Sequence, residues 1–285
     1  MNKGRITIHI ATRDRHTELA ILLESLRHQS YQDFDVLIVD DASGTPPTQA
    51  YFISYLITRM KLEGHKFKMI RNGFSQGCCY ARNKCIEEDD FDNEFTFRCD
   101  DDVVLNSDYI EKLLEVIEKG FDMASGVVPG LNAPEVKRNV ENVGAVINKK
   151  ELDDEGNITK YGDDCGYCYT EDKIILTPEF RTNCLYKSEI NKVVSYPQTL
   201  TTVSFREEGF FSFGAILEGY TIGINTAAKT YHLQCPSGGN RREDYSQCVK
   251  QDDEVFRKWV KKQFQKHGNF LEEYYKNGIY KNKTA

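Results

Sequence analysis

The chain has 285 residues, of which 40% are hydrophobic, enough to build the core of one large α/β domain or of two small ones. A net charge of -7, with most basic residues dispersed, excludes a general nucleic-acid-binding protein. No apolar run approaches the roughly 20 residues that cross a bilayer, and no signal-peptide core follows Met1, so we expect a cytoplasmic protein without a transmembrane segment.

The first half of the chain predicts repeated strand–helix units. Residues 5–11 alternate isoleucines with other residues, as a strand does, and leucines at helical spacing follow from Leu19 to Leu26. Residues 36–39 are a continuous apolar run, typical of a strand covered on both faces. The later units are a helix from Thr45-Pro46 towards Gly64, a strand over 67–70, a loop over 72–77, a helix over 78–88, a strand over 95–99, and a helix from Ser107 as N-cap to Gly120.

Four polar loops follow these predicted strands. They comprise residues 12–15, 40–41, 71–77 and 100–102. Repeated β-α units form a mostly parallel sheet, and the ligand crevice of such a sheet lies at the carboxyl ends of its strands. The four loops should therefore meet at one edge and form a nucleotide site.

Beyond Gly130 the pattern is weaker. Residues 143–147 and 158–161 flank an acidic turn and predict a hairpin, and a short strand is expected over 174–176. The remaining expected elements are a helix from Phe205 towards Gly219 with Phe210 and Phe213 on one face, a strand over 221–225 followed by residues 229–232, and a charged helix around 253–265. We found no repeat and no low-complexity linker.

The nine cysteines form an odd set without the spacing of a disulfide scaffold, so we expect reduced thiols. Cys165 and Cys168 form the one Cys-x-x-Cys pair. A structural zinc site needs a second pair, and the remaining candidates, Cys184 and Cys235, are single residues far away in the sequence.

Three adjacent carboxylates, Asp100, Asp101 and Asp102, follow the apolar run 95–97. Such carboxylates at the end of a buried strand repel one another unless a cation or a strong set of donors compensates. A divalent cation held by one or two carboxylates and by phosphate oxygens is a common way to bind a nucleotide diphosphate. The alternative is a solvated acidic turn before the next helix.

Several further segments follow one another in the order in which similar segments occur in one enzyme family. Residues 8–15 look like its opening strand and loop, although Ala-Thr-Arg-Asp stands where Pro-Thr-Tyr-Asn is usual. Residues 37–43 are similar to its apolar run followed by two aspartates, a small residue and serine. The other matching blocks are 72–77 with 81–83, the Asp-x-Asp motif at 100–102, the acidic pair 207–208, the pair 219–220 and His232. Together these segments resemble the family 2 glycosyltransferases of the GT-A fold.

This resemblance implies an α/β fold with a Rossmann-like, mostly parallel central sheet, helices on both of its faces, a small antiparallel region and a C-terminal helical extension. The transferase domain would cover residues 1–235, with a nucleotide-binding half at about 1–130 and an acceptor-binding half at about 131–235. Residues 236–285 would form a lid loop and the helical extension.

The resemblance also implies roles on the donor side. Asp41 would hydrogen-bond the nucleotide base, most often uracil in this family; an ordinary turn aspartate is the alternative. Contacts to the nucleotide sugar are expected from Thr12, Arg13 and Arg15. Arg82 would contact the pyrophosphate or brace the base loop, although arginines are also common on helix surfaces.

Within the acidic motif, Asp100 or Asp101 would meet the ribose or a bridging water, and Asp102 would be the direct metal ligand, with Asp100 as a second candidate. His232 would complete the metal shell or hold the diphosphate. A histidine together with carboxylates favours Mn²⁺ over Mg²⁺.

The acidic pair is usually Glu-Asp in the family, and here it is Glu207-Glu208. Glu208 is our candidate for the general base that takes the proton of an acceptor hydroxyl, and Glu207 is the alternative. A solvent-facing glutamate at a helix N-terminus would explain the same residue without catalysis.

We therefore expect an inverting, metal-dependent glycosyltransferase that uses a nucleotide-diphosphate sugar, with uridine diphosphate as the expected nucleotide, and a glycan or glycoconjugate acceptor. A sugar-phosphate nucleotidyltransferase is an alternative, but residues 12–15 lack the glycines that it needs. The other alternative is a non-catalytic module that binds sugar nucleotides.

The segment from Cys235 to Asp244 contains two glycines followed by Arg241 and Arg242, whose forked donors suit phosphate oxygens. It is expected to close over the diphosphate, with an exposed linker as the alternative.

Overall fold

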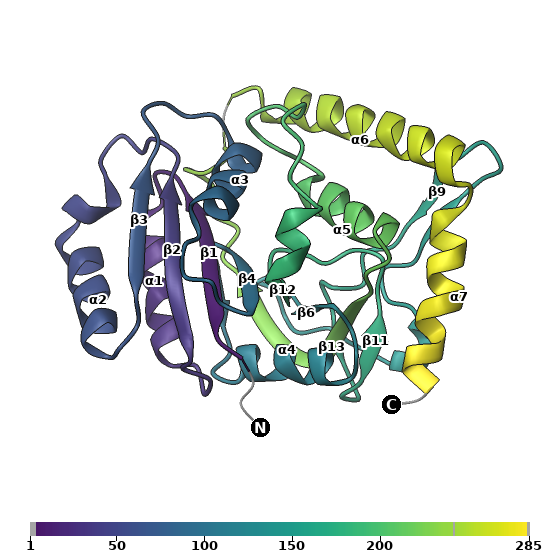
Figure 1. Ribbon diagram of the computed structural model, residues 1–285, viewed down its shortest axis with the longest axis horizontal. Helices are drawn as coiled ribbons and strands as arrows, with labels where there is room; N and C mark the ends of the chain where they lie inside the picture. The colour runs from purple at the N-terminus through teal and green to yellow at the C-terminus, as the bar shows by residue number, and fades with distance from the viewer. Residues whose placement is uncertain (1–3, 242, 284–285) are drawn as a thin grey trace.

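A nine-stranded mixed sheet forms the centre of the computed structural model, which describes residues 4–241 and 243–283 (Figure 1). Its strands are β1 (Ile6–Thr12), β2 (Phe34–Asp40), β3 (Phe67–Arg71), β4 (Phe95–Asp100), β5 (Val103–Leu105), β6 (Met123–Val127), β11 (Ile174–Leu176), β12 (Cys184–Lys187) and β13 (Ile222–His232). The order across the sheet is β11-β13-β6-β12-β4-β1-β2-β3, and β5 pairs with β13.

The remaining elements surround this sheet. The helices are α1 (His16–Arg27), α2 (Tyr51–Leu62), α3 (Cys78–Glu88), α4 (Tyr109–Glu118), α5 (Glu207–Leu217), α6 (Tyr245–His267) and α7 (Phe270–Lys283). Short 3-10 turns are η1 (Pro47–Gln49), η2 (Val140–Val143) and η3 (Ser188–Lys192). Two small sheets pair β7 (Lys137–Arg138) with β10 (Cys168–Tyr169), and β8 (Lys150–Leu152) with β9 (Ile158–Tyr161).

The sheet contains the parallel strands predicted for the first half of the chain, and a further parallel pair, β6 with β13. Strands β3, β2, β1 and β4 run in the same direction and lie side by side in Figure 1. All residues of β2 are buried, which accounts for its continuous apolar run, because helices cover both faces of the sheet. The predicted fold class, with its parallel sheet, small antiparallel sheets and C-terminal helices, is confirmed.

Strand β12 was not predicted, although it lies in the middle of the sheet. It runs antiparallel between β4 and β6 and places Cys184 opposite Arg98. The pairing brings the residues just before β12, Thr182 and Asn183, beside the carboxyl end of β4. The second half of the chain thereby reaches the predicted ligand edge.

The C-terminal helices share the core of the rest of the chain. On α6, Phe256 packs against Phe210 and Phe213 of α5, with ring centroids 5.1 and 5.5 Å apart. On α7, Phe270 lies 5.7 Å from Phe213, and the hydroxyl of Tyr274 donates to the carbonyl of Thr177. The helical extension is thus part of one hydrophobic core, while the functional division at residue 235 stays a prediction.

Two predicted helix starts were wrong. The helix expected from Thr45-Pro46 begins only at Tyr51, because Pro46 is itself followed by a proline and adopts an extended ψ of 137°. The helix expected to be capped by Ser107 has Asp108 as its N-cap residue, without a side-chain capping bond.

The predicted hairpin strand over 143–147 was also wrong. Its turn and its second strand, β9, are as expected, but the partner strand is β8, three residues further along. Residues 140–143 form the turn η2, and Val146 and Ile147 are buried beside Leu176. These apolar side chains therefore mark core contacts and not one face of a hairpin.

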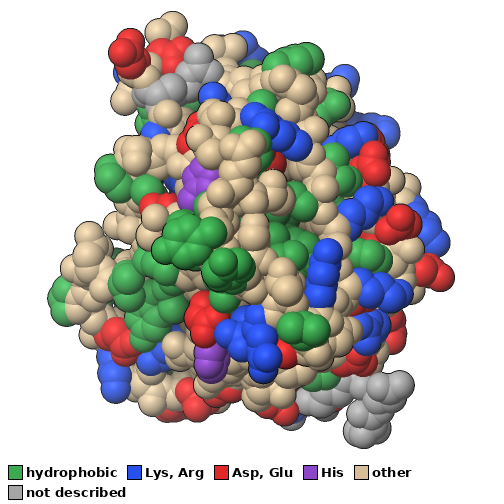
Figure 2. Space-filling view, turned by 90° about the vertical axis from the view of Figure 1, so that its left-hand side faces the viewer, with side chains coloured by type: hydrophobic (Ala, Val, Ile, Leu, Met, Phe, Trp, Pro, Cys, Tyr) green, Lys and Arg blue, Asp and Glu red, His purple; other side chains and the backbone are tan. Residues whose placement is uncertain are grey.

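Helix α2 forms one side of the molecule, onto which Figure 2 looks. Hydrophobic side chains gather on this face, and Tyr51, Tyr55 and Leu62 are 70%, 69% and 76% exposed. The opposite side of α2 buries Ile53 and Met60 against the core.

Among the described residues, no helix is both long and apolar enough to span a membrane.

Candidate active site

The loops at the carboxyl ends of β1 to β4 line a pocket of about 420 Å³. Glu179, Arg181, Thr182 and residues 202–208, from the second half of the chain, line it as well. All the predicted site residues border this pocket: Thr12, Arg13, Arg15, Asp41, Arg82, Asp100, Asp101, Asp102, Glu207, Glu208 and His232. The structure thus brings the candidates together, while their individual roles remain predictions.

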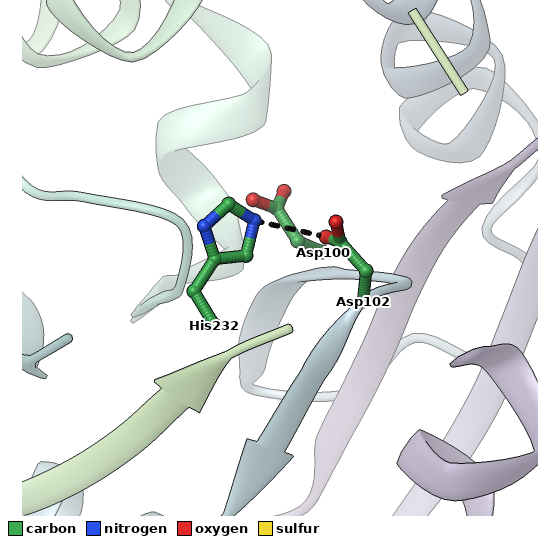
Figure 3. Close-up of side chains that lie close together, drawn as sticks. All are labelled: Asp100, Asp102 and His232. Carbon is green, nitrogen blue, oxygen red and sulfur yellow. Dashed lines mark hydrogen bonds and ion pairs between the residues drawn. The ribbon is translucent and has the colours of Figure 1, made fainter. Parts of the chain in front are cut away.

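Asp100, Asp102 and His232 form a candidate metal centre (Figure 3). One ligand atom from each lies within 4.8 Å of the others, and His232 Nε2 is 3.2 Å from Asp102 Oδ1. The backbone explains this approach, because Val103 pairs with His232 and the N–H of Leu233 donates to the carbonyl of Asp102 at 2.9 Å. Two carboxylates and an imidazole suit a divalent cation, so the residues present fit the predicted metal.

Asp101 is turned to the loop after β1 and away from this cluster of ligands. Arg15 Nη1 lies 2.9 Å from Asp101 Oδ1 and from Asp102 Oδ2, and the hydroxyl of Thr12 donates to Asp101 Oδ2 at 2.8 Å. Burial raises the pKa of Asp101 to about 6, against the effect of Arg15. Thr12 and Arg15 therefore hold the acidic motif in place.

Charges also determine the protonation of the metal-centre residues. Burial alone would raise the pKa of Asp102, but His232 and Arg15 outweigh it and the pKa is lowered. Conversely, burial alone would lower the pKa of His232, and Asp102 outweighs it, so that this pKa is raised.

Asp41 organises the loop after β3. Its carboxylate accepts hydrogen bonds from Asn72 Nδ2 at 2.9 Å, from the Ser75 hydroxyl at 2.7 Å and from the N–H of Gly77 at 2.9 Å. Gly77 has a φ of +94°, and a Cβ there would lie 2.7 Å from the Cα of Thr202, so only glycine fits. The predicted contact of Asp41 with a nucleotide base stays a prediction.

A second cluster of charges is buried on the other side of Asp100. Arg82 Nη2 lies 2.5 Å from Asp100 Oδ1, and Arg82 Nε lies 3.3 Å from Glu207 Oε1. Arg98 Nη2 also contacts Glu207 Oε1 and lies 3.3 Å from Asp100 Oδ1. Burial raises the pKa of Glu207 to about 7, although both guanidinium groups act to lower it.

Glu208 is the more accessible member of the acidic pair. Its side chain is 26% exposed, compared with 7% for Glu207, and both residues border the pocket. The N–H of Thr182 donates to Glu208 Oε1 at 3.3 Å. Both glutamates lie at the start of α5, which follows Arg206 in a left-handed conformation with φ of 75°. A group that must meet a substrate hydroxyl is better placed at Glu208.

The loop expected to act as a lid packs against the loop after β1. The N–H of Gly239 donates to the carbonyl of Arg13 at 2.7 Å, and Asn240 Nδ2 donates to the carbonyl of Val203 at 2.7 Å. Arg241 borders the pocket, whereas Arg242 lies outside the described residues. The side chain of Arg13 lies 3.6 Å from Asp14, and among the described residues it forms no ion pair with the acidic motif.

Sequence reasoning missed Arg98 and Thr182. A signal for Arg98 existed, because an arginine inside the apolar run Phe-Thr-Phe-Arg-Cys needs a buried partner. Thr182 carried no such signal, since its place depends on the unpredicted strand β12.

Cys165 and Cys168 are both buried, and no cysteine joins a metal-ligand cluster in the part of the chain that the structure describes.

Solved structures share this fold at low sequence identity. S. aureus TarS 1–349 superposes with a TM-score of 0.55 at 16% identity, covering 92% of this chain and 72% of that one. GalNAc-T7, crystallised with UDP, GalNAc and Mn²⁺, gives a TM-score of 0.66 at 13% identity, covering 97% of this chain and 57% of that one. These likenesses show a GT-A fold.

Sequence comparison gives the family. An uncharacterized glycosyltransferase of Haemophilus influenzae is 30% identical over 114 residues, which is 40% of this chain and 35% of that protein, so the chain aligns with only part of that relative. Residues 7–175, more than half of the chain, match the family described as Glycosyl transferase family 2. The family match, the GT-A fold and the acidic motif in the pocket agree with one another. The chain therefore belongs to the family 2 glycosyltransferases.

Proposed function

We propose that the protein transfers a hexosyl or N-acetylhexosaminyl group from a uridine diphosphate sugar to a hydroxyl of a glycan or glycoconjugate, with inversion at the anomeric carbon. The observation that carries this proposal is the presence of the metal-ligand cluster and of Glu208 in one pocket. The structures of GalNAc-T7 with UDP, GalNAc and Mn²⁺ and of TarS with UDP-GlcNAc support the choice of donor. A cytoplasmic location stays our prediction.

Asp100, Asp102 and His232 would hold Mn²⁺, or Mg²⁺ in its place. The bound cation would neutralise the negative charge that grows on the departing diphosphate, which is a large part of catalysis in phosphate-leaving reactions. Arg15 would keep Asp102 in position from the side opposite His232, since its guanidinium lies 2.9 Å from Asp102 Oδ2.

Glu208 would act as the general base. The acceptor hydroxyl would give its proton to the Glu208 carboxylate while its oxygen bonds to the anomeric carbon, and the bond from that carbon to the diphosphate oxygen would break. A single in-line displacement of this kind inverts the configuration. Glu207 is less suited to the role, because Arg82 and Arg98 both contact its Oε1 in a buried position.

The remaining residues would bind the donor. Asp41 and the loop that it holds would meet the base, and Arg82 and Arg13 would be near the pyrophosphate. The loop 235–244 would cover the diphosphate and exclude water. Residues 131–235 would supply the acceptor side of the pocket.

A panel of nucleotides tests this function. Thermal unfolding is measured with UDP, GDP, UDP-glucose and UDP-N-acetylglucosamine, each with and without Mn²⁺, and UDP release is followed with the two sugar nucleotides. A ligand at 100 times its dissociation constant stabilises the fold by about 2.7 kcal/mol, so binding will be visible. We expect stabilisation that needs both UDP and Mn²⁺, with slow release of UDP. Binding without any turnover in the presence of acceptors would indicate a non-catalytic module.

A further inference from the structure

Arg98 is a buried cation in the strand that leads to the acidic motif. Its side chain is 2% exposed, and it stands two residues before Asp100 on β4. Since side chains alternate along a strand, Arg98 and Asp100 point to the same face of the sheet. A guanidinium is retained in a dry interior only when hydrogen bonds and carboxylates surround it.

The partners of Arg98 come from three separate segments. Its Nη2 contacts Glu207 Oε1 and lies 3.3 Å from Asp100 Oδ1 and 3.7 Å from Glu208 Oε1. Its Nη1 donates to the backbone carbonyl of Thr182. Arg98 therefore connects the metal motif after β4, the loop before β12 and the start of α5.

The contact with Thr182 is the more informative one, because the neighbouring peptide group binds Glu208. Arg98 holds the carbonyl of Thr182, while the N–H of the same residue donates to Glu208 Oε1 at 3.3 Å. Thr182 has a φ of +52°, an unfavourable conformation for a β-branched residue that persists only where its surroundings impose it. Arg98 is one of the groups that impose it.

Arg82 provides a contrast within the same cluster. Its guanidinium lies 2.5 Å from Asp100 and 3.3 Å from Glu207. No contact of Arg82 with Glu208 or Thr182 occurs among the described residues. The two arginines therefore share Asp100 and Glu207, and they differ in their connection to Glu208.

We infer that Arg98 is a positioning residue that sets the place of the Glu208 carboxylate relative to Asp100, an inference that rests on the proposed role of Glu208 as general base. The planar fork of arginine reaches Thr182, Glu207 and Asp100 at once, which the single ammonium of lysine cannot do. Arg98 acts on the reaction through Glu208 and does not itself touch the substrates.

The test compares Arg98→Lys with Arg82→Lys, using Mn²⁺ with UDP for binding and the hydrolysis of UDP-N-acetylglucosamine and UDP-glucose for turnover. For Arg98→Lys we expect kcat to fall about 10- to 100-fold, because misplacing a reacting group by about 1 Å costs this much. The Kd of UDP with Mn²⁺ should change less than about two-fold, because Arg82, at 2.5 Å against 3.3 Å for Arg98, still holds Asp100 and Arg15 still holds Asp102. For Arg82→Lys the Kd should rise about ten-fold, since Arg82 orients the metal ligand Asp100.

A double-variant cycle separates positioning from general damage. If Arg98 acts through Glu208, Arg98→Lys adds no further loss of kcat to Glu208→Gln, whereas independent effects would multiply. Arg5→Lys is the control for losing a forked arginine, because Arg5 pairs with Asp33 and Asp35 near the opposite ends of β1 and β2 and should leave turnover unchanged. If Arg98→Lys does not fold, Thr182→Gly takes its place, because glycine accepts the φ of Thr182 without strain and loosens the same peptide.

The outcomes distinguish the two proposals. Full turnover in Glu208→Gln would overturn the role of Glu208 and with it the proposed mechanism. A large loss in Glu208→Gln, together with wild-type kcat in Arg98→Lys or losses that multiply in the double variant, would overturn the role of Arg98 alone.

Discussion

Asp100 separates two charged clusters that meet in the pocket and obtain their positive charge from different sources. The metal-side cluster consists of Asp101, Asp102, Arg15 and His232, and the base-side cluster consists of Arg82, Arg98, Glu207 and Glu208. On the base side, both glutamate carboxylates lie close to the guanidinium group of an arginine of the chain. On the metal side, two carboxylates share a single guanidinium and a histidine.

This difference in charge balance indicates which part of the site needs a bound cation. The metal side has an excess of negative charge at the edge of the pocket, which a divalent ion would balance. The base side is balanced internally, because Arg82 and Arg98 both contact Glu207 and Arg98 also lies 3.7 Å from Glu208. Changes on the metal side should therefore alter binding and turnover. On the base side, changes to Arg98, Glu207 and Glu208 should alter turnover alone, whereas Arg82 also orients the metal ligand Asp100 and should affect binding.

The largest expected effect is that of Asp102→Asn. The substitution keeps the shape of the side chain and removes a charged ligand, so both the binding of UDP with Mn²⁺ and the release of UDP should be lost. We expect kcat/KM to fall about 10⁴-fold, which corresponds to about 5.5 kcal/mol. Calorimetric titration and turnover at increasing Mn²⁺ measure the two effects.

Asp108→Asn is a matched control, because Asp108 pairs with Lys112 on the outside of α4 and should have no effect. Near wild-type activity of Asp102→Asn at high Mn²⁺ would contradict the metal assignment and remove the contrast between the clusters.

Glu208→Gln should have the next largest effect. The amide cannot take a proton, so kcat should fall about 10³-fold while UDP and Mn²⁺ bind as in the wild type. Glu207→Gln, measured in parallel, should reduce kcat about ten-fold, by disturbing the arginines that surround the base. The reverse order of these two losses would move the general base to Glu207.

Glu207 should also make the stability of the protein depend on pH. Its pKa is about 7 in the folded chain and near 4.5 in the unfolded chain, so between these values the folded state binds the additional proton. The free energy of unfolding should therefore decrease as the pH rises from about 4.5 to 7, by about 1–3 kcal/mol. Denaturant unfolding of the wild type and of Glu207→Gln across this range measures the effect, and the decrease should be smaller in the variant, in which Asp101, with its pKa raised to about 6, still contributes. Equal slopes for both proteins would contradict the raised pKa.

The smallest expected effect concerns the loop 235–244. If it covers the diphosphate, UDP together with Mn²⁺ should slow tryptic cleavage within this loop about ten-fold, because cleavage follows the population of the open loop. Neither ligand alone should do so. Cleavage after Lys61, on exposed α2, is the internal reference and should not change. Unchanged cleavage of the loop at saturating ligand would make it a linker, and the predicted function of this segment would be wrong.

The sequence predicts the fold best where the hydrophobic pattern of a segment agrees with the burial of its side chains in the folded chain. The apolar run of β2, the leucines of α1 and the polar residues after each parallel strand follow from periodicity and from the geometry of β-α units. The same reasoning places residues 12–15, 40–41 and 100–102 at one edge of the sheet. The predicted start of a helix at Pro46 was wrong, because a second proline follows and the helix begins further along the chain. The predicted strand at Val146 and Ile147 was wrong, because these apolar side chains are buried in the core and do not form one face of a hairpin.

By itself, the sequence determined the family, the parallel strands β1 to β4 and eleven of the residues that border the pocket, because these depend on short motifs and on contacts within successive units. The tertiary structure alone decided how the acidic residues divide between two clusters. That division depends on β12, which enters the sheet antiparallel and brings Thr182 to Arg98, and on the pairing of β5 with β13, which brings His232 to Asp102. Such pairings join residues about 80 to 130 positions apart, and no local pattern specifies them.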